Sequence, residues 1–160
     1  MARKVFFSFH YERDAWRAGV VRNSDVTKDS VEAAGFIDAA DWEKVEKEGD
    51  ENIKRWIAKQ LDGTSVTVVL IGTETSNRRW VKYEIQKSYE KGNGLLGIYI
   101  HNIKDKGNTD KQGDVLFGEI GKDVNGNSLY FRNVAKIYDW ENNDGYHNLG
   151  KWVEEVAPKK

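Results

Sequence analysis

The chain has 160 residues, of which 39% are hydrophobic and 12% aromatic, and its 25 basic residues nearly balance its 26 acidic ones. A chain of this length forms about one domain with a single sizeable core, and the composition excludes a disordered or fibrous segment. The formal net charge of -1 provides no field that would hold a nucleic-acid backbone or an anionic membrane. We therefore expect no nucleic-acid partner and no membrane association.

The sequence contains no cysteine, which excludes disulfides, thiolate metal sites and a cysteine nucleophile. Its three histidines lie far apart without ligand-spaced partners, so no metal site is expected. The N-terminal apolar run is too short for a signal peptide, and no run of about eighteen apolar residues could span a membrane. A cytoplasmic protein is the expectation.

The first half of the chain alternates short apolar runs with helical spacing. Val5–Phe9 is apolar and β-favouring, which predicts a central strand buried on both faces. Helical spacing follows over 13–21, and Gly35–Asp38 predicts a second, very short strand. After a polar stretch, apolar residues from Ile53 to Leu61 recur every three or four positions, which predicts an amphipathic helix that ends at Gly63.

The second half continues the same alternation. Ser65–Ile71 has the strongest strand pattern of the chain, and an amphipathic helix is predicted over 78–91. Leu95–Ile100 and Ala135–Tyr138 predict the fourth and fifth strands, and Tyr146–Val156 predicts a last amphipathic helix.

Strands that alternate with helices predict a three-layer α/β domain with a five-stranded parallel sheet in the flavodoxin-like order 2-1-3-4-5. We expect one domain over residues 1–157 and a loose tail at 158–160. Residues 104–133 are polar and rich in glycine and asparagine, which predicts an irregular insertion. Within it, Asn125-Gly126 is typical of a small hairpin.

Several chemistries common on such sheets lack their essential residues. A phosphate-binding loop needs closely spaced glycines after the first strand, and residues 10–14 contain none. A phosphoacceptor receiver domain needs an aspartate after the third strand, where Gly72-Thr73 stands. No serine lies in a G-x-S-x-G elbow, so acyl transfer has no support.

In a doubly wound sheet, ligands bind beyond the carboxyl ends of the strands where the strand order reverses. For the order 2-1-3, this crevice lies between the first and third strands. The polar and aromatic side chains expected near it are Ser8, Phe9, His10, Asn23, Asp38, Thr73 and Ser76. Some have ordinary alternatives: His10 as a strand-end residue, Asn23 as a helix stop and Asp38 as a cap.

Trp80 and Glu84 are four residues apart on the predicted helix and share a face about 100° from the Val81 and Ile85 stripe. This spacing predicts a partly sheltered carboxylate beside an indole, a place suited to stabilising positive charge on a ribose ring. By spacing alone, a solvated surface glutamate is the commoner explanation.

Three segments, at 4–11, 80–85 and 96–102, resemble in their order and spacing the bacterial TIR-like family found in Thoeris antiphage-defence systems. The resemblance extends to about Val156. In ordinary TIR domains the first strand ends in a Phe-Ile-Ser-Tyr type box, to which residues 6–9 correspond with Phe9 in place of the tyrosine. Many TIR domains also have a cysteine where Val81 stands.

This resemblance implies that Glu84 is the catalytic glutamate, because the family's glutamate follows a tryptophan near the start of the helix after the third strand. It implies NAD as substrate with no further cofactor, nicotinamide as leaving group, and ADP-ribose or a cyclic ADP-ribose isomer as product. It also implies a nucleotide-sensing effector protein that receives the product, and self-association of the chain.

Two other functions stay open. One is a catalytically silent TIR-like adaptor that acts by protein contacts, with the insertion at 104–133 as its contact region. The other is an enzyme similar to nucleoside deoxyribosyltransferases, which also place a glutamate at a glycosidic centre. A requirement for a 2′-deoxy substrate would distinguish that enzyme.

Overall fold

The computed structural model describes residues 3–24, 31–37 and 39–158, and it contains a five-stranded sheet of order β2-β1-β3-β4-β7. The strands are β1 (Arg3–Ser8), β2 (Val31–Ala34), β3 (Val66–Ile71), β4 (Gly94–Tyr99) and β7 (Lys136–Asp139). Every neighbouring pair runs parallel. The predicted order 2-1-3-4-5 is confirmed, with β7 as the fifth strand.

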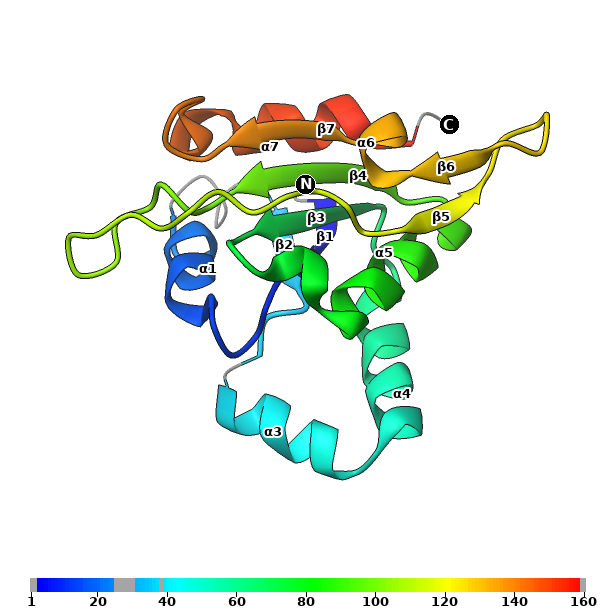
Figure 1. Cartoon of the computed structure of the whole chain (residues 1–160), viewed down its shortest axis with the longest axis horizontal. Helices are drawn as coiled ribbons and strands as arrows, with labels where there is room; N and C mark the ends of the chain where they lie inside the picture. Colours follow the sequence, from blue (N-terminus) through cyan, green and yellow to red (C-terminus); the bar gives the residue numbers. More distant parts are fainter. Residues whose placement is uncertain (1–2, 25–30, 38, 159–160) are drawn as a thin grey trace.

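Helices enclose the sheet on both sides, and Figure 1 shows α7 and α5 on opposite sides of the strands. The helices are α1 (Ala15–Arg22), α3 (Ala39–Lys47), α4 (Asp50–Leu61), η1 (Thr75–Asn77), α5 (Arg79–Lys91), α6 (Phe131–Val134) and α7 (Gly145–Val156). None of these described helices combines the length and apolar character that a membrane crossing needs.

The core is divided by the sheet because successive residues of a strand point to opposite faces. In β3, Val68 and Leu70 join the core that includes the apolar side chains of α1 and α7. Val69 and Ile71 join the core under α5. The side chains of β3 are buried on both faces, which accounts for the continuous apolar run in its sequence.

Two predictions for the segment between β1 and α4 were wrong. The second strand is β2 at Val31–Ala34, not Gly35–Asp38, because the backbone at Gly35 turns to a φ of 88° and leaves the sheet. A side chain at Gly35 would also collide with the carbonyl of Phe7. The polar stretch expected after it forms α3, whose buried apolar contact is Trp42. Asp38 lies outside the described residues.

The predicted helices α4, α5 and α7 are present, and the insertion contains the predicted hairpin. Its strands β5 (Glu119–Lys122) and β6 (Ser128–Tyr130) pair antiparallel around Asn125-Gly126. The insertion packs on the domain through Phe117 and Ile120, which are buried in the core under α5. It is therefore anchored to the same helix that carries Glu84.

Candidate active site

Glu84 lies on the face of α5 that packs against the sheet. It is 0% exposed and forms one buried stripe with Val81, Ile85 and Ser88. The expectation of a partly sheltered carboxylate on a separate face was wrong. The helix packs against three strands, β1, β3 and β4. The buried face of α5 is therefore wide enough to include Glu84 together with Val81 and Ile85.

Both carboxyl oxygens of Glu84 accept a hydrogen bond from a hydroxyl group. The Ser8 hydroxyl donates to Oε1 at 2.7 Å, and the Tyr11 hydroxyl donates to Oε2 at 2.6 Å. Ser8 is the last residue of β1, and Tyr11 lies in the turn that follows this strand. The Glu84 side chain therefore lies at the C-terminal end of the central strand β1. In a doubly wound sheet, ligands bind at this edge, where the strand order reverses.

Burial sets the ionisation of this carboxyl. Removal from water disfavours the charged form and raises the pKa of Glu84 from its ordinary 4.5 to about 8, although the hydrogen bonds from Tyr11 and Ser8 act in the opposite direction. The same burial, with the charge of Glu84, raises the pKa of Tyr11 well above its ordinary value. In this conformation burial therefore favours the neutral form of the carboxyl. A strongly shifted group of this kind is typical of a functional site.

An aromatic cluster, formed by Phe9, Tyr11, Trp42 and Trp56, covers the side of Glu84 where Tyr11 lies. The ring centroid of Tyr11 is 4.6 Å from those of Phe9 and Trp42 and 5.7 Å from that of Trp56. Trp42 comes from α3 and Trp56 from α4, and their rings contact each other at 5.6 Å. The three members other than Phe9 were absent from the predicted site. Tyr11 could have been found from its place just after Ser8 at the same strand end.

A small hollow adjoins the aromatic cluster. Its volume is about 10 Å³, which is room for roughly one water molecule. The residues that line it are Phe9, His10, Tyr11, Glu12, Trp42, Arg78, Trp80 and Val81. Three predicted site residues, Phe9, His10 and Trp80, are thus brought together here.

His10 and Trp80 have defined surroundings at this hollow. The Nδ1 atom of His10 accepts a hydrogen bond from the Arg13 backbone N–H at 3.2 Å. Burial, with the nearby Arg78 guanidinium, lowers the pKa of His10, which favours a neutral imidazole. The Trp80 ring lies edge-on to Tyr83 and under the guanidinium of Arg79 at 4.4 Å. The aromatic ring of Trp80 and the imidazole of His10 therefore line the small hollow beside Tyr11.

The other predicted site residues that the structure describes lie outside the lining of the hollow. The Thr73 hydroxyl donates to the Lys111 carbonyl at 2.5 Å, so it holds the insertion against the end of β3. Ser76 is buried in η1 near Asp114 of the insertion. Asn23 is exposed at the end of α1. Their proposed contacts with a nucleotide stay predictions.

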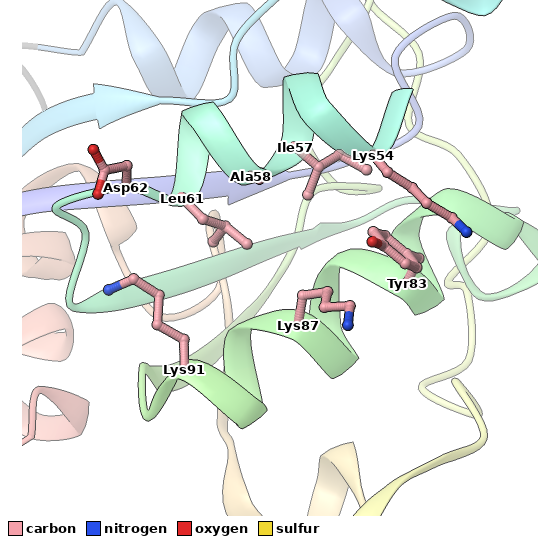
Figure 2. A pocket seen from close by; sticks show the side chains of 8 residues that line it. All are labelled: Lys54, Ile57, Ala58, Leu61, Asp62, Tyr83, Lys87 and Lys91. Atoms are coloured by element: carbon pink, nitrogen blue, oxygen red, sulfur yellow. The ribbon is translucent and has the colours of Figure 1, made fainter. Parts of the chain in front are cut away.

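A larger hollow of about 390 Å³ lies between α4 and α5 (Figure 2). Figure 2 shows Lys54, Lys87 and Lys91 around it. Glu84 is not part of its lining, since this residue faces the sheet on the opposite side of α5. Among the described residues, no three His, Asp or Glu side chains form a set that could hold a metal ion.

Together, the sheet order and the buried glutamate at the end of β1 define a flavodoxin-like α/β protein with its candidate site at the topological switch point. Residues 6–105 match the family model described as "Thoeris protein ThsB, TIR-like domain". A protein of Bacillus cereus (strain MSX-D12), named "Putative cyclic ADP-D-ribose synthase ThsB1", is 39% identical over 191 aligned positions. The alignment covers 96% of this chain and 100% of that protein. The chain belongs to the ThsB TIR-like family, as its resemblance to Thoeris proteins predicts.

Proposed function

We propose that this protein is a TIR-type enzyme that consumes NAD, breaks the bond between nicotinamide and ribose, and releases ADP-ribose or a cyclic ADP-ribose isomer. The observation that carries the proposal is the fully buried Glu84 carboxyl, which accepts two hydrogen bonds from hydroxyl groups at the end of the central strand. The printed name of the 39% identical relative, a cyclic ADP-D-ribose synthase, supports the same chemistry.

The reaction needs little acid catalysis because nicotinamide is bound to ribose as a cation. When the C1′–N bond breaks, its electron pair moves to the nicotinamide nitrogen, and neutral nicotinamide leaves. The positive charge stays on the ribose C1′ and ring oxygen. A positive charge beside Glu84 favours the ionised form of this carboxyl, which would in turn stabilise that charge. Attack by water at C1′ with loss of a proton gives ADP-ribose. Attack at C1′ by a hydroxyl or adenine nitrogen of the same molecule, also with loss of a proton, gives a cyclic product.

Hydroxyl recognition by Glu84 supports this assignment. The carboxyl already accepts hydrogen bonds from a serine and a tyrosine hydroxyl. The two ribose hydroxyls next to C1′ offer donors of the same type. A carboxylate that holds a ribose hydroxyl also fixes the position of the neighbouring C1′.

The proposal extends to the partners and the biological setting. NAD is the substrate, and no further cofactor is required by the steps above. The nucleotide product is a signal that a separate nucleotide-sensing effector protein receives in antiphage defence, and the enzyme acts as a self-associated assembly in the cytoplasm. These expectations rest on membership of the Thoeris ThsB family.

Nicotinamide release from NAD tests the proposal, with purified protein and with protein taken from phage-challenged cells. Wild type should release nicotinamide, and Glu84→Gln should lower the rate by about 100-fold or more, the usual effect of removing a group that stabilises transition-state charge. Glu90→Gln, an exposed position on the same helix, is the matched control and should behave as wild type. No release by either wild-type sample, with phage protection intact, would favour the adaptor function instead.

A further inference from the structure

The two hydroxyl groups that hold Glu84 belong to different kinds of segment. Ser8 ends β1 and is in register with Val69 of β3, so the sheet fixes its position. Tyr11 lies in a turn between β1 and α1, outside both elements. Its ring packs against the rings of Phe9, Trp42 of α3 and Trp56 of α4. The sheet therefore fixes the position of the Ser8 donor but not that of the Tyr11 donor.

The space around Glu84 is too small for a nucleotide while Tyr11 occupies this position. Tyr11 is 4% exposed and Glu84 is 0% exposed. The adjoining hollow of about 10 Å³ compares with the roughly 300–1,000 Å³ of pockets that hold small ligands. A ribose reaches the carboxyl only after the phenol ring has moved.

The chemistry of the contact matches that of the substrate. The phenolic O–H donates to Glu84 Oε2 at 2.6 Å, as a ribose hydroxyl would in the proposed reaction. We propose that Tyr11 is an internal competitor of the substrate, whose hydroxyl occupies the Glu84 oxygen required by ribose and whose ring fills the space required by the sugar. This inference rests on the proposed function for the identity of the substrate, but the blocking contact does not depend on it.

Competition inside the protein has a defined kinetic consequence. If a fraction of the molecules is open, the apparent dissociation constant of the substrate is the intrinsic constant divided by that fraction. Any contact that draws Trp42 and α3 away from Tyr11 raises the open fraction without touching the substrate. The aromatic cluster thereby couples the position of α3 to the accessibility of Glu84.

Tyr11→Phe is the direct test because it keeps the ring and removes the hydroxyl. The closed form then leaves Glu84 Oε2 without this donor, and a buried acceptor without a partner is destabilising. The open fraction should rise by about ten-fold, which equals ~1.4 kcal/mol. KM for NAD should fall by a similar factor while kcat stays within about two-fold. Tyr83→Phe, a half-buried tyrosine on α5, is the matched control and should leave both constants unchanged.

A second measurement reports accessibility without any turnover. A water-soluble carbodiimide with an added amine converts exposed carboxyls to amides, and peptide mass spectrometry gives the rate at each site. Glu84 should be modified at least about five-fold faster in Tyr11→Phe than in wild type, with exposed Glu90 modified equally in both. Trp42→Leu, which removes a ring that holds Tyr11 from α3, should accelerate modification in the same direction.

The outcomes separate this inference from the proposed function. Faster modification of Glu84 in Tyr11→Phe supports the blocking contact even if no sample cleaves NAD, in which case the proposed function alone fails. Equal modification rates in wild type, Tyr11→Phe and Trp42→Leu would overturn the blocking contact. A lower kcat for Tyr11→Phe with unchanged KM would also overturn it, because Tyr11 would then assist Glu84 during the reaction.

Discussion

Helix α5 buries two polar side chains one turn apart, Glu84 and Ser88. They differ in whether the side chain can ionise and in the groups that hold it. The Ser88 hydroxyl donates to the Glu84 carbonyl at 2.7 Å and accepts from Thr67 at 2.7 Å, and Asn93 also donates to Thr67 at 3.2 Å. All of these groups are uncharged. Such a network satisfies buried polar atoms and fastens α5 to β3.

Glu84, in contrast, is an ionisable group buried at the end of the sheet where ligands bind in this type of fold. Its hydrogen bonds do not offset the cost of its burial, because its pKa is raised to about 8. The comparison shows that burial and hydrogen bonding alone do not mark a functional residue. What distinguishes Glu84 from Ser88 is an ionisable group whose pKa is strongly raised by burial, at the end of the sheet where ligands bind in this type of fold.

The largest expected effect is on the pH dependence of the free energy of unfolding. Because the folded protein binds the Glu84 proton more tightly than the unfolded chain, the free energy of unfolding falls as pH rises from the ordinary pKa of 4.5 to about 8. Relative to Glu84→Gln, wild type should lose roughly 3 kcal/mol between pH 5 and pH 8. Urea unfolding at unit pH intervals measures this difference, with Glu90→Gln as the exposed control. Parallel curves for wild type and Glu84→Gln would contradict the raised pKa.

A smaller effect should separate the two polar groups in turnover, through the hydroxyl that contacts each of them. Ser8→Ala removes a donor that holds the Glu84 carboxyl, so kcat for NAD cleavage should fall by about ten-fold. Ser88→Ala removes a hydroxyl that contacts the backbone carbonyl of Glu84 and not its carboxyl, so kcat should stay within about two-fold. Steady-state kinetics on the two variants gives the comparison. An equal loss in both would mean that they act through the position of the helix and not through the carboxyl.

The smallest effect belongs to the uncharged network. Ser88→Ala leaves the Thr67 hydroxyl without its acceptor and should reduce the free energy of unfolding by ~1 kcal/mol, with the same pH dependence as wild type. Urea unfolding at pH 7 measures the loss of stability. The same experiment at pH 5 and pH 8 measures whether the pH dependence is that of wild type. A pH dependence that differs from wild type would show that Ser88 affects the ionisation of Glu84.

Much of this arrangement follows from the sequence. The continuous apolar run at 66–71 and the helical spacing of α4, α5 and α7 predict these elements, because their patterns are regular, and the alternation of strands with helices predicts a parallel sheet. The position of β2 was missed because Gly35 departs from the strand by a positive φ that no periodicity reveals. Helix α3 was missed because it buries little besides Trp42.

The site was predicted less completely than the fold. Ser8, Phe9, His10, Trp80 and Glu84 do gather at the end of β1, as the strand order predicts. The depth of Glu84 was not predictable, since helical spacing gives the direction of a side chain but not the width of the face that neighbouring elements cover. The contact from Tyr11 depends on the rings of α3 and α4, which are distant in sequence.

The central claim is that Glu84 provides the carboxylate for cleavage of NAD. Mass analysis of the nucleotides made from NAD by wild type and by Glu84→Gln tests it most directly, because ADP-ribose and its cyclic isomers differ in mass by one water. Wild type should give one or both of these products together with nicotinamide, and Glu84→Gln should leave NAD intact. Equal products from the two proteins would contradict the assignment of Glu84.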